Sequence, residues 1–126
     1  MPNPNIKDPA SLYLRADAVT LNTATAVSST TTLLENPAST STVFKLSTLV
    51  MSNTTGAAAT ATVYFVTNIT ATAFKSVLTS GSVPGGASLV VVGRDSPLYI
   101  PPGTAIRARA STASSIDAVL SFEEIA

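Results

Sequence analysis

Few side chains in this sequence could carry out chemistry. Its 126 residues include no histidine and no cysteine, which excludes Ser-His-Asp and Cys-His arrangements and most transition-metal sites. Carboxylate pairs can hydrolyse sugars, but most of the carboxylates here fall at predicted turns or chain ends. Glu123 and Glu124 are neighbours on a predicted strand, so they should point to opposite faces. We therefore expect no enzyme activity, no metal and no cofactor.

The candidate partner contacts are Tyr64, Arg107 and Arg109. Arg107 and Arg109 alternate with apolar residues in TAIRARAS, so both should share the outer face of one strand. There they could bind a carboxylate or phosphate of a partner, or form a solvated face that opposes edge-to-edge aggregation. Asn53 and Asn68 begin N-x-T motifs, which we interpret as coincidental because nothing indicates a secretory route.

The composition excludes several classes of partner. The formal net charge is zero and only 11% of residues are charged, so we expect binding neither to nucleic acid nor to an acidic membrane surface. The N-terminus lacks the apolar core of a secretory signal, and no apolar run is long enough for a membrane span. A low-charge surface rich in Ser and Thr suits a protein in contact with copies of itself or a larger assembly. The alternative is that Thr is frequent only because it fits strands.

The elements that must position these residues are strands. Apolar and polar residues alternate with period two from Ser11 onward, and turn signals recur about every ten residues. This pattern predicts an all-β protein, an antiparallel β-sandwich or jelly roll of about eight short strands. We expect one sandwich domain over residues 11–126, preceded by an extended Pro-rich arm over 1–10.

Two segments define the expected core. The longest strand, TVFKLSTLVMSN, should place Phe44, Leu46, Thr48 and Val50 on one face, and TATVYFVTNI should be its antiparallel partner. Pro84-Gly85 and Pro102-Gly103 are expected at the two central positions of type II turns. The predicted core residues are Val50, Val63, Phe65, Leu89, Val91, Ile106, Leu120 and Phe122.

The order of strand and turn segments resembles small virion structural proteins of tailed bacteriophages, including cyanophages. The segments that carry the resemblance are TTLLENPASTSTVFKLSTLVMSNTTGAAATATVYFV, SVPGGASLVVVGRDSPLYIPPGTAIRARAS and IDAVLSFEEI, from about Thr30 to Ile125. It implies a non-enzymatic protein of the virion, assembled in the host cytoplasm as a homo-oligomer such as a trimer. Its neighbours would be the major capsid protein or neck and tail proteins, and its place a capsid decoration (cement) or a neck or tail accessory position.

Two other functions stay open. A carbohydrate-binding or receptor-binding module is a common use of a β-sandwich, and it would stack an exposed aromatic side chain on a sugar. The sequence has no tryptophan, but Tyr13, Tyr64, Tyr99 and the four phenylalanines are available. A cellular β domain that mediates protein contacts is the third possibility.

Overall fold

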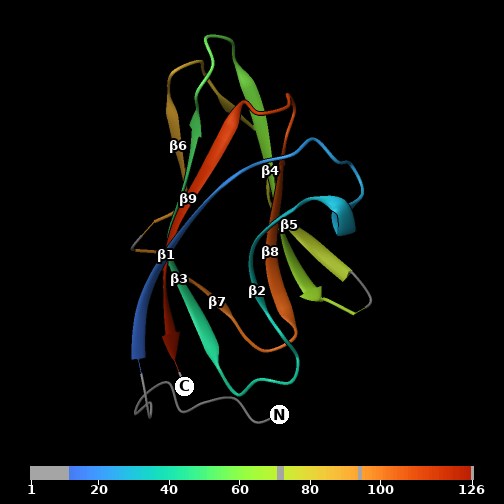
Figure 1. Cartoon of the computed structure of the whole chain (residues 1–126), viewed down its shortest axis with the longest axis vertical. Helices are drawn as coiled ribbons and strands as arrows, with labels where there is room; N and C mark the ends of the chain where they lie inside the picture. Colours follow the sequence, from blue (N-terminus) through green and yellow to red (C-terminus); the bar gives the residue numbers. More distant parts are fainter. Residues whose placement is uncertain (1–11, 71–72, 94, 126) are drawn as a thin grey trace.

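The computed structural model describes residues 12–70, 73–93 and 95–125, which form two antiparallel β-sheets packed face to face (Figure 1). The arm predicted for residues 1–10 lies outside the described residues. One short 3-10 helix, η1, accompanies the strands. In chain order the elements are β1 (Leu12–Thr20), η1 (Val27–Ser29), β2 (Thr31–Asn36), β3 (Val43–Asn53), β4 (Ala59–Asn68), β5 (Ala73–Val83), β6 (Ser88–Val92), β7 (Leu98–Ile100), β8 (Thr104–Ala110) and β9 (Ile116–Ile125).

The strand order confirms an antiparallel sandwich. One sheet has the order β1-β9-β3-β6, with β7 also paired to β3, and the other has the order β2-β8-β4-β5. The pairing is nested: the first strand pairs with the last, the second with the next to last, and the middle strands with one another. The prediction that β4 is the partner of β3 is wrong, because β4 pairs with β5 and β8 in the opposite sheet.

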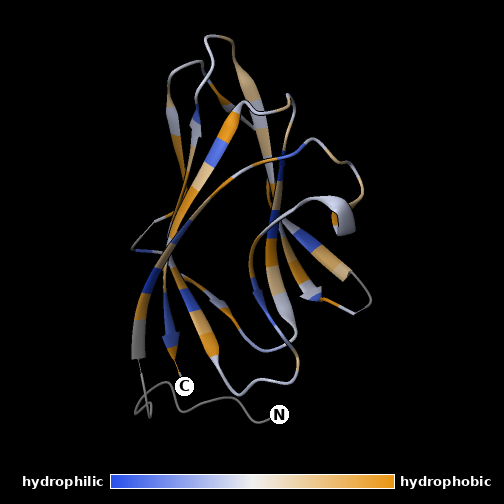
Figure 2. Cartoon of the chain, viewed as in Figure 1, coloured by the Kyte–Doolittle hydropathy of each residue, from blue (hydrophilic) through white to orange (hydrophobic). Residues whose placement is uncertain are grey.

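Alternating side chains build the core between the sheets. Figure 2 shows hydrophobic and hydrophilic residues alternating along the strands. On β9, Leu120 and Phe122 are buried, as the sequence predicts, and Ile116 and Ala118 on the same face are buried too. Val63 and Ile106 are also buried as predicted. Three further predicted core residues pack against the core but are only partly buried, namely Phe65, Leu89 and Val91.

Val50 is the predicted core residue that the structure contradicts. The register between β3 and β9 shifts between Leu46 and Thr48, which is a β-bulge. One extra residue exchanges inward and outward positions in the rest of the strand. Leu49 and Met51 therefore fill the core with 0% exposure, while Val50 lies on the outer face of the sheet.

The position of the proline within the turn differs by one residue between the two Pro-Gly turns. At the second turn, Gly103 has φ +84° and the Thr104 amide donates to the Pro101 carbonyl at 3.3 Å, so Pro102 and Gly103 are the central residues as predicted. At the first, the Ala87 amide donates to the Pro84 carbonyl at 3.0 Å. Pro84 therefore precedes the two central residues instead of being one of them, and the predicted position is wrong.

Two buried asparagines tie loops to strand ends. Asn36 Nδ2 donates to the carbonyls of Thr42 at 2.6 Å and Ile100 at 2.9 Å. Asn53 Nδ2 donates to the carbonyls of Ala57 at 2.8 Å and Val83 at 2.9 Å. Buried backbone carbonyls need hydrogen-bond donors, and these two side-chain amides supply them where the loops cross the ends of the sandwich.

Candidate interaction surfaces

The structure brings the three predicted contact residues together on the outer face of the β2-β8-β4-β5 sheet. Tyr64 on β4 lies directly opposite Arg107 on β8, and Arg109 is two residues further along β8. Arg109 Nε donates to the Tyr64 hydroxyl at 3.3 Å. The Tyr64 ring meets Phe74 of β5 edge to face, with ring centroids 5.2 Å apart.

Arg107 uses its guanidinium to hold the segment that contains η1. Its Nε donates to the Thr30 hydroxyl at 3.2 Å, and its Nη2 donates to the carbonyls of Ser28 (3.2 Å) and Thr30. These contacts hold the segment against the outer face, where Val27 packs in a small cluster with Tyr64, Val66 and Ala105.

Tyr64 consequently faces outward from its sheet but is only 8% exposed. Its ring is covered by neighbouring side chains, whereas Arg107 and Arg109 are half-buried. Sequence reasoning missed this cover because part of it comes from Val27, in a distant segment that carries no strand pattern, and part from Phe74 across the β4–β5 pairing. Because the Arg107 guanidinium is engaged with Ser28 and Thr30, Arg109 is the best placed of the three residues to reach a partner.

A second outer surface lies on the β1-β9-β3-β6 sheet. Ala18, Val119, Val50 and Val90 lie opposite one another in register and form one apolar row across all four strands. Val119 is 48% exposed and Val90 63% exposed. We call these four residues the apolar row. Sequence reasoning missed it because its alignment depends on the β3 bulge and on three separate strand pairings.

Small hydroxyl side chains border the apolar row. Ser121 and Thr48 lie on one side of it, and Ser52 and Ser88, whose hydroxyls are 3.0 Å apart, lie on the other. Asp117 is in this second border, and its carboxylate accepts a hydrogen bond from the Thr20 hydroxyl at 2.6 Å. The surface therefore combines a low density of charge with short side chains.

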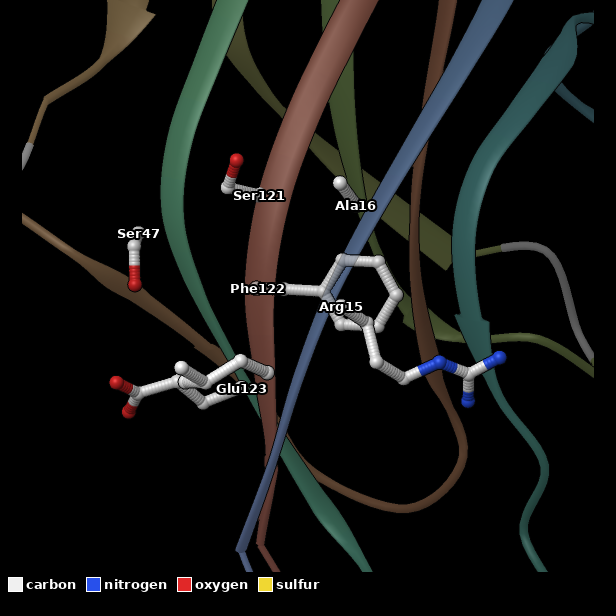
Figure 3. A pocket seen from close by; sticks show the side chains of 7 residues that line it. Arg15, Ala16, Ser47, Ser121, Phe122 and Glu123 are labelled. Carbon is white, nitrogen blue, oxygen red and sulfur yellow. The ribbon is translucent and has the colours of Figure 1, made fainter.

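A shallow hollow of about 410 Å³ lies beside β1, with Leu14, Ala16, Ser47, Ser121 and Glu123 among its lining residues. Figure 3 shows the Glu123 carboxylate on one side of β1 and the Arg15 guanidinium on the other. Arg15 lies over the Phe122 ring, 5.6 Å from its centroid, and its Nη1 is 3.6 Å from Glu124.

Glu123 and Glu124 of β9 each lie beside a basic side chain. Glu124 pairs with Arg15, while Glu123 is 3.9 Å from the Lys45 ammonium group. Residues 12–70, 73–93 and 95–125 contain no group of three or more acidic side chains that could hold a metal ion. In the same part of the chain, no helix is long and apolar enough to cross a lipid bilayer.

Asn53, the first residue of one N-x-T motif, is 2% exposed. Both ends of its side-chain amide are engaged, because Oδ1 accepts hydrogen bonds from the Thr55 amide and hydroxyl at 2.9 and 2.8 Å. In the folded protein this asparagine therefore has a structural role in the turn after β3.

No family model, curated protein or solved structure matches this chain. The resemblance to bacteriophage virion proteins thus stays a prediction from the sequence.

Proposed function

We propose that this chain is a non-enzymatic structural protein of a bacteriophage virion. It would assemble on the particle as a capsid decoration (cement) protein or as a neck or tail accessory component. The nested strand pairing supports this proposal, because it follows the jelly-roll scheme if β6 and β7 are taken as one interrupted strand. Jelly rolls are common in viral capsid proteins and in lectins.

The observation that carries the proposal is the apolar row. The row is exposed at Ala18, Val119 and Val90 and half-buried at Val50, and a continuous apolar strip of this kind favours a contact surface. Short hydroxyl side chains on both sides let another subunit approach closely. Contacts of this kind are weak singly, but on a repeating lattice they hold through multivalency.

The rival function is binding of a carbohydrate or receptor. Tyr64 is buried, so it offers no stacking surface. Phe74 and Tyr99 are 44% and 42% exposed, but they lie on β5 and β7, in different sheets. Among the side chains that the structure describes, a sugar site on either sheet would therefore rest on a single one of these rings, and a glycan array tests whether one is enough.

Labelling of intact particles tests the virion assignment. Phage particles from cells that carry the gene would be purified, labelled with a gold-conjugated antibody against this chain, and viewed by electron microscopy. Label over the head supports decoration, and label at the head–tail junction or tail supports an accessory position. Particles without label, in a lysate where the protein is abundant, would refute the proposal.

A further inference from the structure

The free edge of β1 is an unpaired surface of the β1-β9-β3-β6 sheet. Among the described residues, 12–70, 73–93 and 95–125, β1 pairs only with β9, which leaves its other edge without a strand partner. Residues 14–18 are all exposed, and Leu14 is 78% exposed. A long exposed edge of this kind can accept another strand by backbone hydrogen bonding.

Two hydrogen bonds show which backbone groups face this edge. The Leu21 amide, just beyond the strand, donates to the Ile116 carbonyl at 2.9 Å, so odd-numbered residues face β9. The Ala18 amide instead donates to the neighbouring Asp17 carboxylate at 2.8 Å. Because the backbone groups of successive residues point to opposite sides, Leu14, Ala16 and Ala18 present their N–H and C=O groups to the free edge.

We propose that a second copy of this chain occupies the edge, with the two β1 strands antiparallel about a two-fold axis at Ala16. The charged side chains of β1 favour an axis at Ala16 over an axis at either neighbouring residue. An axis at Arg15 would place Arg15 opposite itself, and an axis at Asp17 would place Asp17 opposite itself, so like charges would meet in both cases. An axis at Ala16 places each Arg15 opposite Asp17 of the second copy, which forms two reciprocal ion pairs.

Strand length and side-chain size select the same register. Ala16 is the central residue of β1, which runs from Leu12 to Thr20, so an axis there overlaps the two strands completely. The outward amides and carbonyls of one strand then meet those of the other. The exposed Leu14 lies opposite Ala18 of the second copy, and the small alanine leaves room for it.

The arrangement already present around Arg15 is compatible with this dimer. Glu124 and the Phe122 ring hold the guanidinium beside the edge strand, on the face opposite the Glu123 carboxylate (Figure 3). The exposed Arg15–Glu124 pair contributes little by itself. The Asp17 carboxylate accepts a hydrogen bond from the adjacent Ala18 amide, and pairing of the strands would give that amide a carbonyl partner instead.

The proposal does not rest on a place in a virion, and it commits to a two-fold dimer where the resemblance to virion proteins suggests a trimer. Sedimentation equilibrium of the full chain should give twice the 12.8 kDa chain mass at high micromolar concentration. Ala16→Pro should shift the protein to monomer without loss of folding, since proline at an outward edge position removes no bond to β9. A monomeric wild type, or a dimer unaffected by Ala16→Pro, would overturn the proposal.

Charge exchange tests the register. Arg15→Asp and Asp17→Arg should each weaken the dimer by about tenfold or more, since both place like charges opposite one another. The double variant should regain most of the lost affinity, although the new carboxylate at position 15 faces Glu124 in the same chain. Absence of this recovery would overturn the Ala16-centred register.

Disulfide trapping tests the position of the two-fold axis, and it does not require the dimer to be stable. Opposed hydrogen-bonded residues of antiparallel strands have Cα atoms about 5.5 Å apart, within disulfide range. The chain has no native cysteine, so Ala16→Cys alone should form covalent dimers on oxidation. Leu14→Cys and Ala18→Cys should cross-link when mixed and much less when separate. Failure of Ala16→Cys to cross-link would place the contact elsewhere.

Discussion

Replacement of Asn53 by alanine should destabilise the fold more than its position beside a turn suggests. The side chain is 2% exposed and bonds to the Ala57 and Val83 carbonyls through Nδ2 and to Thr55 through Oδ1. Alanine removes all of these bonds at once. It also takes a donor from the carbonyl of Val83, a residue with 0% exposure.

The size of the expected loss in stability depends on which of the freed carbonyl groups water can reach. Ala57 is exposed, so its carbonyl can bond to water instead, whereas the Val83 carbonyl cannot easily do so. A lost hydrogen bond costs about 1 kcal/mol and a buried polar group without a partner about 1–3 kcal/mol. We expect the free energy of unfolding to fall by about 3 kcal/mol, which lowers the melting temperature of a domain of this size by about 10 °C.

Asn22→Ala is the matched control. Asn22 also bonds through both ends of its amide, to the Ser29 carbonyl at 2.9 Å and from the Ala24 amide at 3.3 Å, but it is exposed. Water can replace these bonds, so the loss should stay below about 1 kcal/mol. Urea unfolding followed by circular dichroism measures both variants. Equal losses, with unchanged m-values, would refute the reasoning that burial makes Asn53 important.

Three further pairs of variants test other parts of the structure by thermal and urea unfolding. A Cβ at Gly85 would lie 2.5 Å from the Gly56 carbonyl carbon, whereas one at Gly56 would meet nothing within 4 Å, so Gly85→Ala should destabilise and Gly56→Ala should not. If the two alanine variants melt together, the close approach of these turns is wrong. Leu49→Ala should cost about 2–5 kcal/mol and Val50→Ala clearly less, because the β3 bulge turns Leu49 inward. The reverse order would contradict the bulge. Tyr64→Phe removes only the bond from Arg109 and should cost about 1 kcal/mol or less, whereas Tyr64→Ala also removes the packing against Val27 and Phe74 and should cost about 3–5 kcal/mol. Similar losses in both would mean that the ring is not covered.

The alternation of apolar and polar residues within single strands predicts much of the fold. The pattern of β9 and of the Arg107–Arg109 segment identifies both the strand and its inward face, because each residue's side depends only on its position within the strand. The β3 bulge does not follow from the same pattern, since beyond it both faces of the strand carry apolar residues, Leu49 and Met51 on one and Val50 on the other. The alternation therefore predicts Val50 in the core, where Leu49 and Met51 lie instead.

Features that depend on the pairing of strands distant in the sequence could not be predicted from the local pattern. The short turn after β3 favours a hairpin with β4, but the chain crosses to the other sheet there, and no residue in the turn signals which path it takes. The meeting of Tyr64 with Arg109 likewise depends on the register between β4 and β8. The sequence could place each of these residues on an outer face, but not show that Val27 and Phe74 pack around Tyr64.

Incorporation of variants into particles tests most directly the claim that the apolar row is the assembly surface. Val119→Asp would be compared with Val77→Asp, because Val119 and Val77 are similarly exposed, at 48% and 42%, and Val77 lies on β5 of the other sheet. Each folded variant would compete with wild-type protein during particle assembly, and its share would be measured by quantitative mass spectrometry. We predict that Val119→Asp is excluded from particles while Val77→Asp enters as wild type does. Equal entry of both variants would contradict the account.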